Sequence, residues 1–178
     1  GELSYTEMEG NIDDLELPSW QIQLAEELAE SGKPLVFVLA EGRPRVFSKI
    51  AHLASAVIYA SYPGPYGGEA IAGVLNGRVN PSAKLALTYP RETNELVLYD
   101  HKFTEGPMHS SVDSNFYPQF EFGYGLSYTK FEYSDIKASS TSFSGLDQLT
   151  ISVTVTNAGD RAGKHPVLLF SQDEYATI

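Results

Sequence analysis

The chain contains no cysteine among its 178 residues, which excludes disulfide bonds, thiol catalysis and cysteine-ligated metals. Long apolar runs are missing as well, since none approaches the ~18 residues that a helix needs to span a bilayer. Positive charge is scarce: 12 Lys and Arg stand against 23 Asp and Glu, a formal net charge of −11. Binding to nucleic acid or to an anionic membrane surface requires a basic face, so both classes are disfavoured.

Hydrophobic residues make up 42% of the chain, which is enough for a packed core. Aromatic residues are frequent, with 11 Tyr and 9 Phe, and we expect some of them to line a surface or a cleft. The first ten residues are polar, and no strand precedes them. Two predicted strands, at residues 149–156 and 165–172, close the chain, although a lone hairpin is marginally stable. We therefore expect a fragment of a longer protein.

The first half alternates between helical and strand patterns. Residues 19–31 have helical spacing, with Pro18 before them and Gly32 as a natural stop. Residues 35–40 and 56–60 are continuous apolar runs, which suit strands buried on both faces of a parallel sheet. Residues 46–54 and 69–75 are predicted helices. This order predicts an α/β fold with a mostly parallel sheet that helices cover.

The pattern changes after Pro81. Residues 84–89 are predicted as a short strand, and residues 91–124 are irregular and rich in aromatics. Strict alternation at residues 149–156 indicates a half-buried antiparallel strand. A Ser/Thr-rich linker is expected at residues 134–144. The second part therefore reads as incomplete antiparallel β-sandwich strands that follow the α/β part.

Ligands of parallel α/β sheets bind at the carboxyl ends of the strands. Three loops qualify here, at residues 1–10, 40–44 and 61–68. Glu69 follows the third loop, where it serves either as a catalytic carboxylate or as a charge that the helix dipole stabilises. The loop lacks both common phosphate-binding glycine spacings. The four His show no paired spacing, so no metal site is expected, and residues 99–102 are either a site or a solvated turn.

Several motifs follow one another along almost the whole chain. They are Gly42-Arg-Pro44, Tyr62-Pro-Gly64, Gly-Gly-Glu-Ala-Ile-Ala at 67–72, Asn-Pro-Ser-Ala-Lys-Leu at 80–85, Thr88-Tyr-Pro90, His101-Lys102, Phe-Glu-Phe-Gly-Tyr-Gly-Leu-Ser-Tyr at 120–128 and Val-Thr-Val-Thr-Asn-Ala-Gly-Asp-Arg-Ala-Gly-Lys at 153–164. Each motif is weak alone, but their ordered combination is specific. Together they resemble the C-terminal half of glycoside hydrolase family 3, of the β-glucosidase type.

The resemblance implies a domain at 1–133, the family's α/β sandwich without its first strand. It also implies the truncated start of a fibronectin type III-like β domain at 134–178. The implied activity is that of a retaining, exo-acting β-glucosidase, which removes terminal non-reducing β-D-glucosyl residues. The nucleophilic Asp of the family lies in an N-terminal barrel, which this chain lacks. The barrel is therefore an implied partner, in the same protein or in another chain.

A retaining glycosidase needs two carboxyl groups about 5–5.5 Å apart, one as nucleophile and one as acid/base. The resemblance implies an acid/base Glu at the second residue after Pro-Gly, and Tyr66 occupies that position here. The nearest carboxylate is Glu69, and Glu7 and Glu2 of the first loop are the other candidates. For substrate binding the resemblance implies Tyr66, His101 and Lys102.

The resemblance implies no cofactor, a β-linked gluco-oligosaccharide as substrate, and a secreted or periplasmic protein. It leaves homodimer formation open. Two alternatives remain: a β-xylosidase of the same family, and a non-catalytic carbohydrate-binding or structural module. Tyr66 favours the second alternative, because the unperturbed pKa of a tyrosine, ~10, makes it a poor acid.

Overall fold

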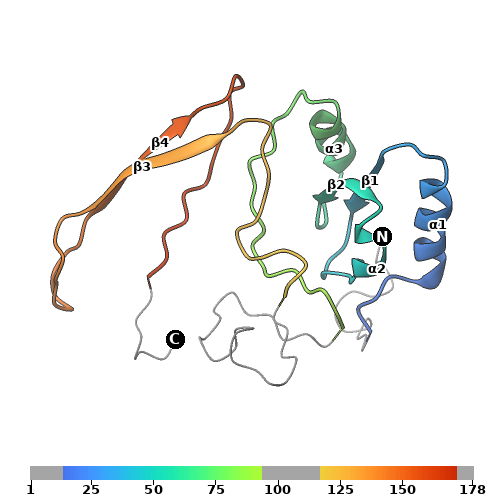
Figure 1. The fold of residues 1–178 in the computed structure, drawn as a ribbon, viewed down its shortest axis with the longest axis horizontal. Helices are drawn as coiled ribbons and strands as arrows, with labels where there is room; N and C mark the ends of the chain where they lie inside the picture. Colours follow the sequence, from blue (N-terminus) through green and yellow to red (C-terminus); the bar gives the residue numbers. More distant parts are fainter. Residues whose placement is uncertain (1–13, 94–116, 172–178) are drawn as a thin grey trace. The chain divides into compact units, whose positions relative to one another are not determined.

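The computed structural model of this chain describes residues 14–93 and 117–171 (Figure 1). Contacts divide the chain into two compact units. The α/β unit comprises Gly1–Gly73 and Leu85–Tyr124, and the hairpin unit comprises Val74–Lys84 and Gly125–Ile178. Within the described ranges, no helix is long and apolar enough to cross a membrane.

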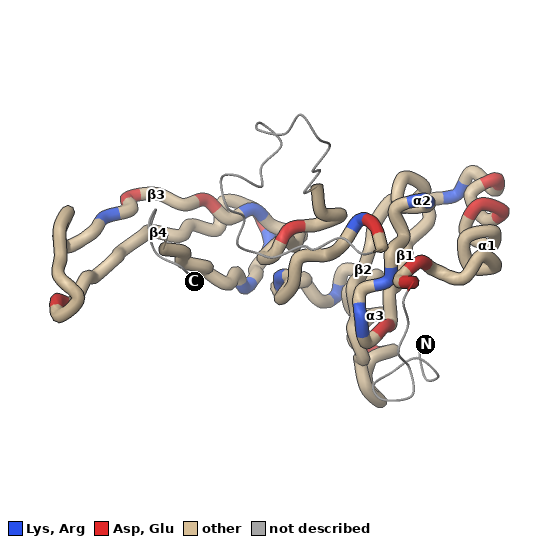
Figure 2. The backbone as a smooth tube through the Cα atoms, turned by 90° about the horizontal axis from the view of Figure 1, so that it is seen from below, with Lys and Arg blue, Asp and Glu red and all other residues tan. Residues whose placement is uncertain are grey.

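Helix α1 spans Ser19–Ala29, which confirms the predicted helix; it begins at the predicted residue and ends two residues earlier. Gly32 follows it with φ of +67°, a backbone conformation that glycine adopts without strain, and its N–H donates to the carbonyl of Ala29 over 3.0 Å. Within the helix Ala25 is buried, whereas Glu26 and Glu27 are exposed. In Figure 2 the Glu positions of α1 are coloured red.

Strands β1 (Leu35–Leu39) and β2 (Ala54–Tyr59) pair in parallel, as predicted. Helix α2, between them, is a single turn at Ser48–Ala51 and is shorter than the predicted 46–54. The shortening has a cause at each end. The backbone of Val46 pairs with that of Glu16, and β2 begins at Ala54. Helix α3, at Gly67–Leu75, begins two residues earlier than predicted.

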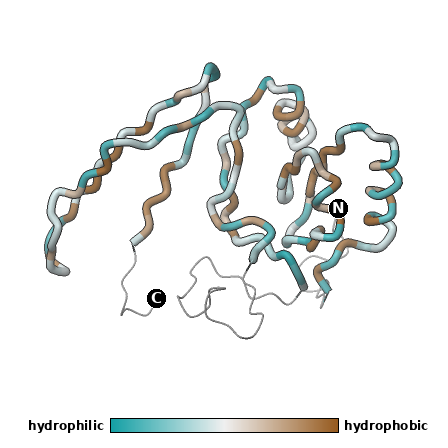
Figure 3. The backbone as a smooth tube through the Cα atoms, in the orientation of Figure 1, coloured by the Kyte–Doolittle hydropathy of each residue, from teal (hydrophilic) through white to brown (hydrophobic). Residues whose placement is uncertain are grey.

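The core of the α/β unit lies on one face of the β1–β2 pair. Its most buried members are Ala25, Phe47, Ile50 and Tyr89, and Phe37 and Leu39 pack against them. Figure 3 shows β1 and β2 among the most hydrophobic segments. On the other face Val36 and Val38 remain 44% and 39% exposed. The prediction of strands buried on both faces is therefore wrong for β1 in the described part of the chain, because its core packs against one side only.

Residues 84–89 do not form the predicted strand; Tyr89 alone makes an antiparallel bridge, to Phe120. The N–H of Leu85 donates to the carbonyl of Tyr124, and the N–H of Tyr89 to that of Phe120, each over 2.8 Å. Within the second segment, the ring of Phe120 stacks on that of Tyr124, with 5.2 Å between the centroids. Residues 85–89 and 119–124 thus run together without forming a regular ladder.

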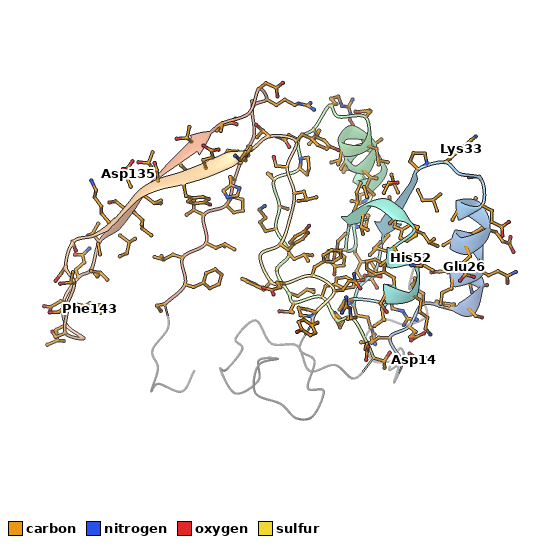
Figure 4. The ribbon with its side chains drawn as sticks, in the orientation of Figure 1. Asp14, Glu26, Lys33, His52, Asp135 and Phe143 are labelled. Atoms are coloured by element: carbon orange, nitrogen blue, oxygen red, sulfur yellow. The ribbon has the colours of Figure 1, made fainter. Side chains whose placement is uncertain are left out.

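The hairpin unit contains β3 (Phe131–Ala138) and β4 (Ile151–Asn157), which pair antiparallel and confirm a sheet separate from β1–β2. Residues 134–138 belong to β3, so the predicted linker at 134–144 is wrong there. The register shifts between Ser134 and Lys137, where Asp135 has φ of +54°, a geometry typical of a β-bulge. Figure 4 places Phe143 at the far end of the hairpin. Residues 165–171 form no strand, contrary to the prediction.

Asn80, in the Val74–Lys84 segment of the hairpin unit, joins that segment to the rest of the unit. Its Oδ1 accepts hydrogen bonds from the hydroxyl of Ser127 at 3.0 Å and from the N–H of Tyr128 at 2.8 Å. Its Nδ2 donates to the carbonyl of Ala162 at 3.1 Å. One amide side chain therefore joins three segments, and it explains why the motifs around residues 80, 127 and 162 occur together. The domain limits of 1–133 and 134–178 stay a prediction.

Candidate functional site

Two loops leave the carboxyl ends of β1 and β2 side by side. The N–H of Ala60 donates to the carbonyl of Leu39 at 2.9 Å, and the N–H of Glu41 donates to the carbonyl of Ser61 at 3.1 Å. The pairing therefore continues past both strands. Ser61 then has φ of +51°, a left-handed conformation that turns the chain away from the sheet. These two loops form the edge at which parallel α/β sheets bind ligands.

The second of these loops leads into α3 and carries two residues singled out in the sequence. Tyr66 is 80% exposed, and its carbonyl accepts the N–H of Ala70 at 3.1 Å. Glu69 lies in the first turn of α3 and is exposed. The structure therefore places the phenol and the carboxylate three residues apart, at the start of one helix. Both are accessible to a ligand.

Glu41, at the end of β1, faces the interior instead. It is only 4% exposed, and its Oε1 accepts a hydrogen bond of 2.6 Å from the hydroxyl of Tyr89. The backbone N–H of Arg45 donates to the same oxygen at 3.3 Å. Burial, and next the negative charge of Glu41, raise the pKa of the Tyr89 phenol. Glu41 is thus a structural carboxylate that holds the 40–44 loop against Tyr89.

Residues 15 and 16, which follow the first predicted loop, are fixed beside residues 45–49. The N–H of Val46 donates to the carbonyl of Leu15 at 2.8 Å, and the guanidinium of Arg45 donates to the carbonyl of Glu16 at 2.7 Å. The carboxylate of Glu16 also forms an ion pair with Lys49. The chain therefore enters α1 from a defined position next to the loop that follows β1.

Asp14 connects this segment to residue 93. Its Oδ1 accepts the N–H of Glu16 at 2.9 Å and the hydroxyl of Thr93 at 3.0 Å (Figure 4 labels Asp14). The first of these hydrogen bonds, and then the second, lower the pKa of the Asp14 carboxyl. The sequence suggests only a helix-start charge for Asp14, because nothing local indicates a partner so far along the chain.

Four of the predicted site residues, Glu2, Glu7, His101 and Lys102, lie outside the described residues. Of the predicted set, only Tyr66 and Glu69 lie among the described residues, just before α3 and in its first turn. No group of three or more His, Cys, Asp or Glu that could hold a metal ion occurs in the part of the chain that the structure describes. The chemistry available at this edge comes from the exposed carboxylate of Glu69 and the exposed phenol of Tyr66. A carboxylate can transfer a proton to a ligand, and a phenol can bind a neutral, hydroxyl-rich ligand.

Comparison with known proteins identifies what the chain is similar to. Residues 1–128 match the profile of the Glycosyl hydrolase family 3 C-terminal domain. A lysosomal β-glucosidase of Dictyostelium discoideum is 38% identical over the whole chain, and the match covers 22% of that protein. A periplasmic β-glucosidase of Salmonella typhimurium is 36% identical over 93% of the chain, which corresponds to 23% of the relative.

A β-xylosidase of Formosa agariphila is 34% identical over 95% of the chain and 24% of its own length. Among solved structures, a β-glucosidase from Erythrobacter marinus superposes with a TM-score of 0.78 at 42% identity. That match covers 90% of this chain and 22% of the solved one, and it supports an α/β fold. The chain thus spans between a fifth and a quarter of the length of these relatives.

Proposed function

The chain belongs to glycosyl hydrolase family 3, and from this premise we propose that it is part of a retaining, exo-acting β-glucosidase. The proposed reaction is hydrolysis of terminal, non-reducing β-D-glucosyl residues from β-linked gluco-oligosaccharides. The observation that carries the proposal is the 38% identity to a β-glucosidase over the whole chain. The accessible carboxylate at the carboxyl edge of the parallel pair is consistent with a catalytic contribution.

In this proposal the chain supplies the acid/base and the surface on the leaving-group side. A barrel elsewhere in the protein, or in a second chain, supplies the nucleophilic Asp. The match to only 22% of the D. discoideum relative supports a contribution from other parts of such a protein. We keep 1–133 as the α/β sandwich domain and 134–178 as the start of a fibronectin type III-like domain. The antiparallel β3–β4 pair supports the second assignment.

For the acid/base we propose Glu69 first, with Glu7 and Glu2 as the alternatives on the first loop. Glu69 is exposed at the ligand edge and follows Tyr66, which we propose as a substrate contact together with His101 and Lys102. An acid catalyst must carry its proton before the glycosidic bond breaks, whereas a helix N-terminus favours a charged carboxylate. Bound substrate and the domain that supplies the nucleophile would have to exclude water from Glu69 to outweigh the dipole.

The test uses the full-length enzyme with Glu69→Gln. Loss of an acid/base slows the reaction by about 10²–10⁴-fold when the leaving group needs protonation. Cellobiose hydrolysis should fall by that factor, and the glycosylation step of an activated aryl β-glucoside should suffer less. Azide should restore deglycosylation, because a small anion needs no general base. Glu26→Gln, which removes an exposed carboxylate on α1, is the matched control and should leave both substrates unaffected.

If Glu69→Gln behaves like wild type while Glu7→Gln or Glu2→Gln gives this pattern, the acid/base lies on the first loop instead. The present chain alone should not hydrolyse an aryl β-glucoside, because it lacks the nucleophile. Adding the barrel, in the same chain or as a second chain, should restore turnover. Activity of the purified chain alone would overturn the proposal that the barrel supplies the nucleophile and this chain the acid/base.

The similarity to a β-xylosidase keeps one further substrate in play. A xyloside lacks only the exocyclic hydroxymethyl group of a glucoside, and nothing among the described residues selects between them. Comparing kcat/KM for 4-nitrophenyl β-glucoside and β-xyloside on the full-length enzyme decides this point. We also propose that the protein is secreted or periplasmic, in line with its lysosomal and periplasmic relatives; fractionation of the source cells tests this.

A further inference from the structure

Tyr62 and Gly42 meet at the candidate site although they come from different loops. A Cβ atom placed on Gly42 would lie 2.5 Å from Cε2 and 2.6 Å from Cζ of Tyr62. A Cβ at this position would force the end of the Tyr62 side chain to shift, so the phenol end of the ring lies directly against the backbone of Gly42. Two of the sequence motifs, Gly42-Arg-Pro44 and Tyr62-Pro-Gly64, are thereby joined in one feature.

Tyr62 contacts Gly42 and stays largely exposed. Although its phenol end touches Gly42, the residue is 55% exposed. Backbone pairing of Glu41 with Ser61 comes directly before the contact and fixes the separation of the two loops. Pro63 follows and restricts the backbone after the ring. An exposed aromatic ring whose end already rests against the backbone loses little conformational entropy when it binds a ligand.

We propose that Tyr62 is a specificity-determining residue that stacks on the sugar ring of the leaving group. This rests on the proposed β-glucosidase function. A β-linked glucose ring has axial C–H groups on both faces, and these pack well on the flat face of an aromatic ring, because they are apolar and carry a slight positive charge toward the π electrons. The hydroxyl groups around the sugar's edge stay free to bond with water or polar groups. A neutral ring needs no charged partner, and Tyr62 supplies none.

The leaving-group side is favoured by the position of Tyr62 on the loop that leads to Tyr66 and Glu69. The proposed acid must reach the glycosidic oxygen, and the leaving-group sugar is attached to that oxygen. A ring four residues before Tyr66 on the same loop is therefore suited to hold the departing sugar. Gly42 has a defined part in this arrangement, since its missing side chain lets the ring settle against the loop.

The experiment compares two substrates on the full-length enzyme: cellobiose, whose leaving group is a sugar, and methyl β-D-glucoside, whose leaving group is not. Tyr62→Ala should lower kcat/KM for cellobiose by about 2- to 13-fold relative to methyl β-glucoside, the size of one lost aromatic stacking contact. Tyr62→Phe keeps the ring and should retain the wild-type ratio. Tyr62→Leu keeps apolar bulk without a flat ring and should behave like Tyr62→Ala.

Gly42→Ala tests the support of the ring without changing Tyr62. The added methyl pushes the phenol end of Tyr62 away from the loop, so Gly42→Ala should lower kcat/KM for cellobiose relative to methyl β-glucoside, in the same direction as Tyr62→Ala. Tyr117→Ala removes a tyrosine of similar exposure, 47%, and should leave the ratio unaltered. An unchanged ratio in Tyr62→Ala, or wild-type behaviour of Tyr62→Leu, would overturn the proposal. If the wild-type enzyme cleaves neither substrate, the proposed function itself fails.

Discussion

The hydroxyl of Tyr89 lies 2.6 Å from Oε1 of Glu41 and 2.8 Å from the carbonyl oxygen of Arg45. Tyr89 is 1% exposed, Glu41 is 4% exposed, and the residues are 48 positions apart in the chain. A buried carboxylate is costly unless it is hydrogen-bonded, so the two side chains depend on each other. This pair fixes the start of the loop on which Gly42 lies.

Tyr89→Phe should destabilise the α/β unit by about 1–3 kcal/mol, because it removes a donor from a buried carboxylate and keeps the ring packing. The measurement is the urea midpoint of the transition that reports this unit in the full-length enzyme. Tyr117→Phe, at an exposed position, should change the free energy of unfolding by less than about 0.5 kcal/mol and so barely move the midpoint. Equal midpoints for Tyr89→Phe and wild type would show that the hydrogen bond contributes nothing.

Alkaline pH should also reveal Tyr89. Its pKa in the folded protein is raised above the ordinary value of 10.0, first by burial and then by the charge of Glu41. A raised pKa adds stability that is complete below pH ~10 and is lost as the pH rises further, since only the unfolded state then releases the proton. Stability should therefore fall above pH ~10, and Tyr89→Phe should fall less steeply.

The check is the absorbance of tyrosinate near 295 nm during alkaline titration. The folded wild type and Tyr89→Phe should ionise the same number of tyrosines, and the wild type should release one more on unfolding. A difference of one tyrosine before unfolding would contradict the buried, protonated phenol.

Gly67 and Gly68 are neighbours at the start of α3 with opposite expectations. A Cβ on Gly67 would press on the ring of Pro63, with Cγ only 2.7 Å away, whereas a Cβ on Gly68 would meet nothing within 4 Å. Gly67→Ala should cost about 1–3 kcal/mol through overpacking. Gly68→Ala should be neutral or stabilise by up to about 1 kcal/mol, because alanine favours the helix. Thermal denaturation of both variants measures the contrast, and equal effects would refute the contact with Pro63.

Asn80→Ala should destabilise the hairpin unit by about 1.5–4.5 kcal/mol, since three hydrogen bonds of roughly 0.5–1.5 kcal/mol each are lost. Asn76→Ala removes one local hydrogen bond, from the N–H of Arg78, and should cost under about 1 kcal/mol. Urea unfolding of the full-length protein, followed by hydrogen exchange in β3 and β4, distinguishes the two. Similar protection in both variants would exclude Asn80 as the joining residue.

Local patterns predicted the elements whose partners lie nearby. The helical spacing after Pro18 gave α1, and the two apolar runs gave β1 and β2 in parallel. The pairing of Tyr89 with Phe120 joins residues 31 positions apart without periodicity, and a one-dimensional pattern carries no signal for it. The same holds for α2, because the backbone bridge from Glu16 to Val46 replaces its first turn.

The candidate site was predictable in its position and less so in its members. The rule of the carboxyl edge located the loops of Glu41 and Tyr66, and the sequence placed Glu69 at a helix start. It gave no indication that Glu41 turns inward, because that depends on a buried donor 48 residues away. Nor did it indicate the contact between Tyr62 and Gly42, which needs the two loops in three dimensions.

Residues 74–84 belong to the hairpin unit, although the chain on both sides of them belongs to the α/β unit. During synthesis Asn80 leaves the ribosome 82 residues before Ala162, a delay of roughly 4–16 s at 5–20 residues per second. The 74–84 segment meets Ser127 and Tyr128 part-way through that interval, but its contact with Ala162 must wait until the end, after residues 85–124 of the α/β unit have been made. Vectorial folding of the two units therefore cannot proceed strictly one after the other, and no single cleavage of the chain separates them intact.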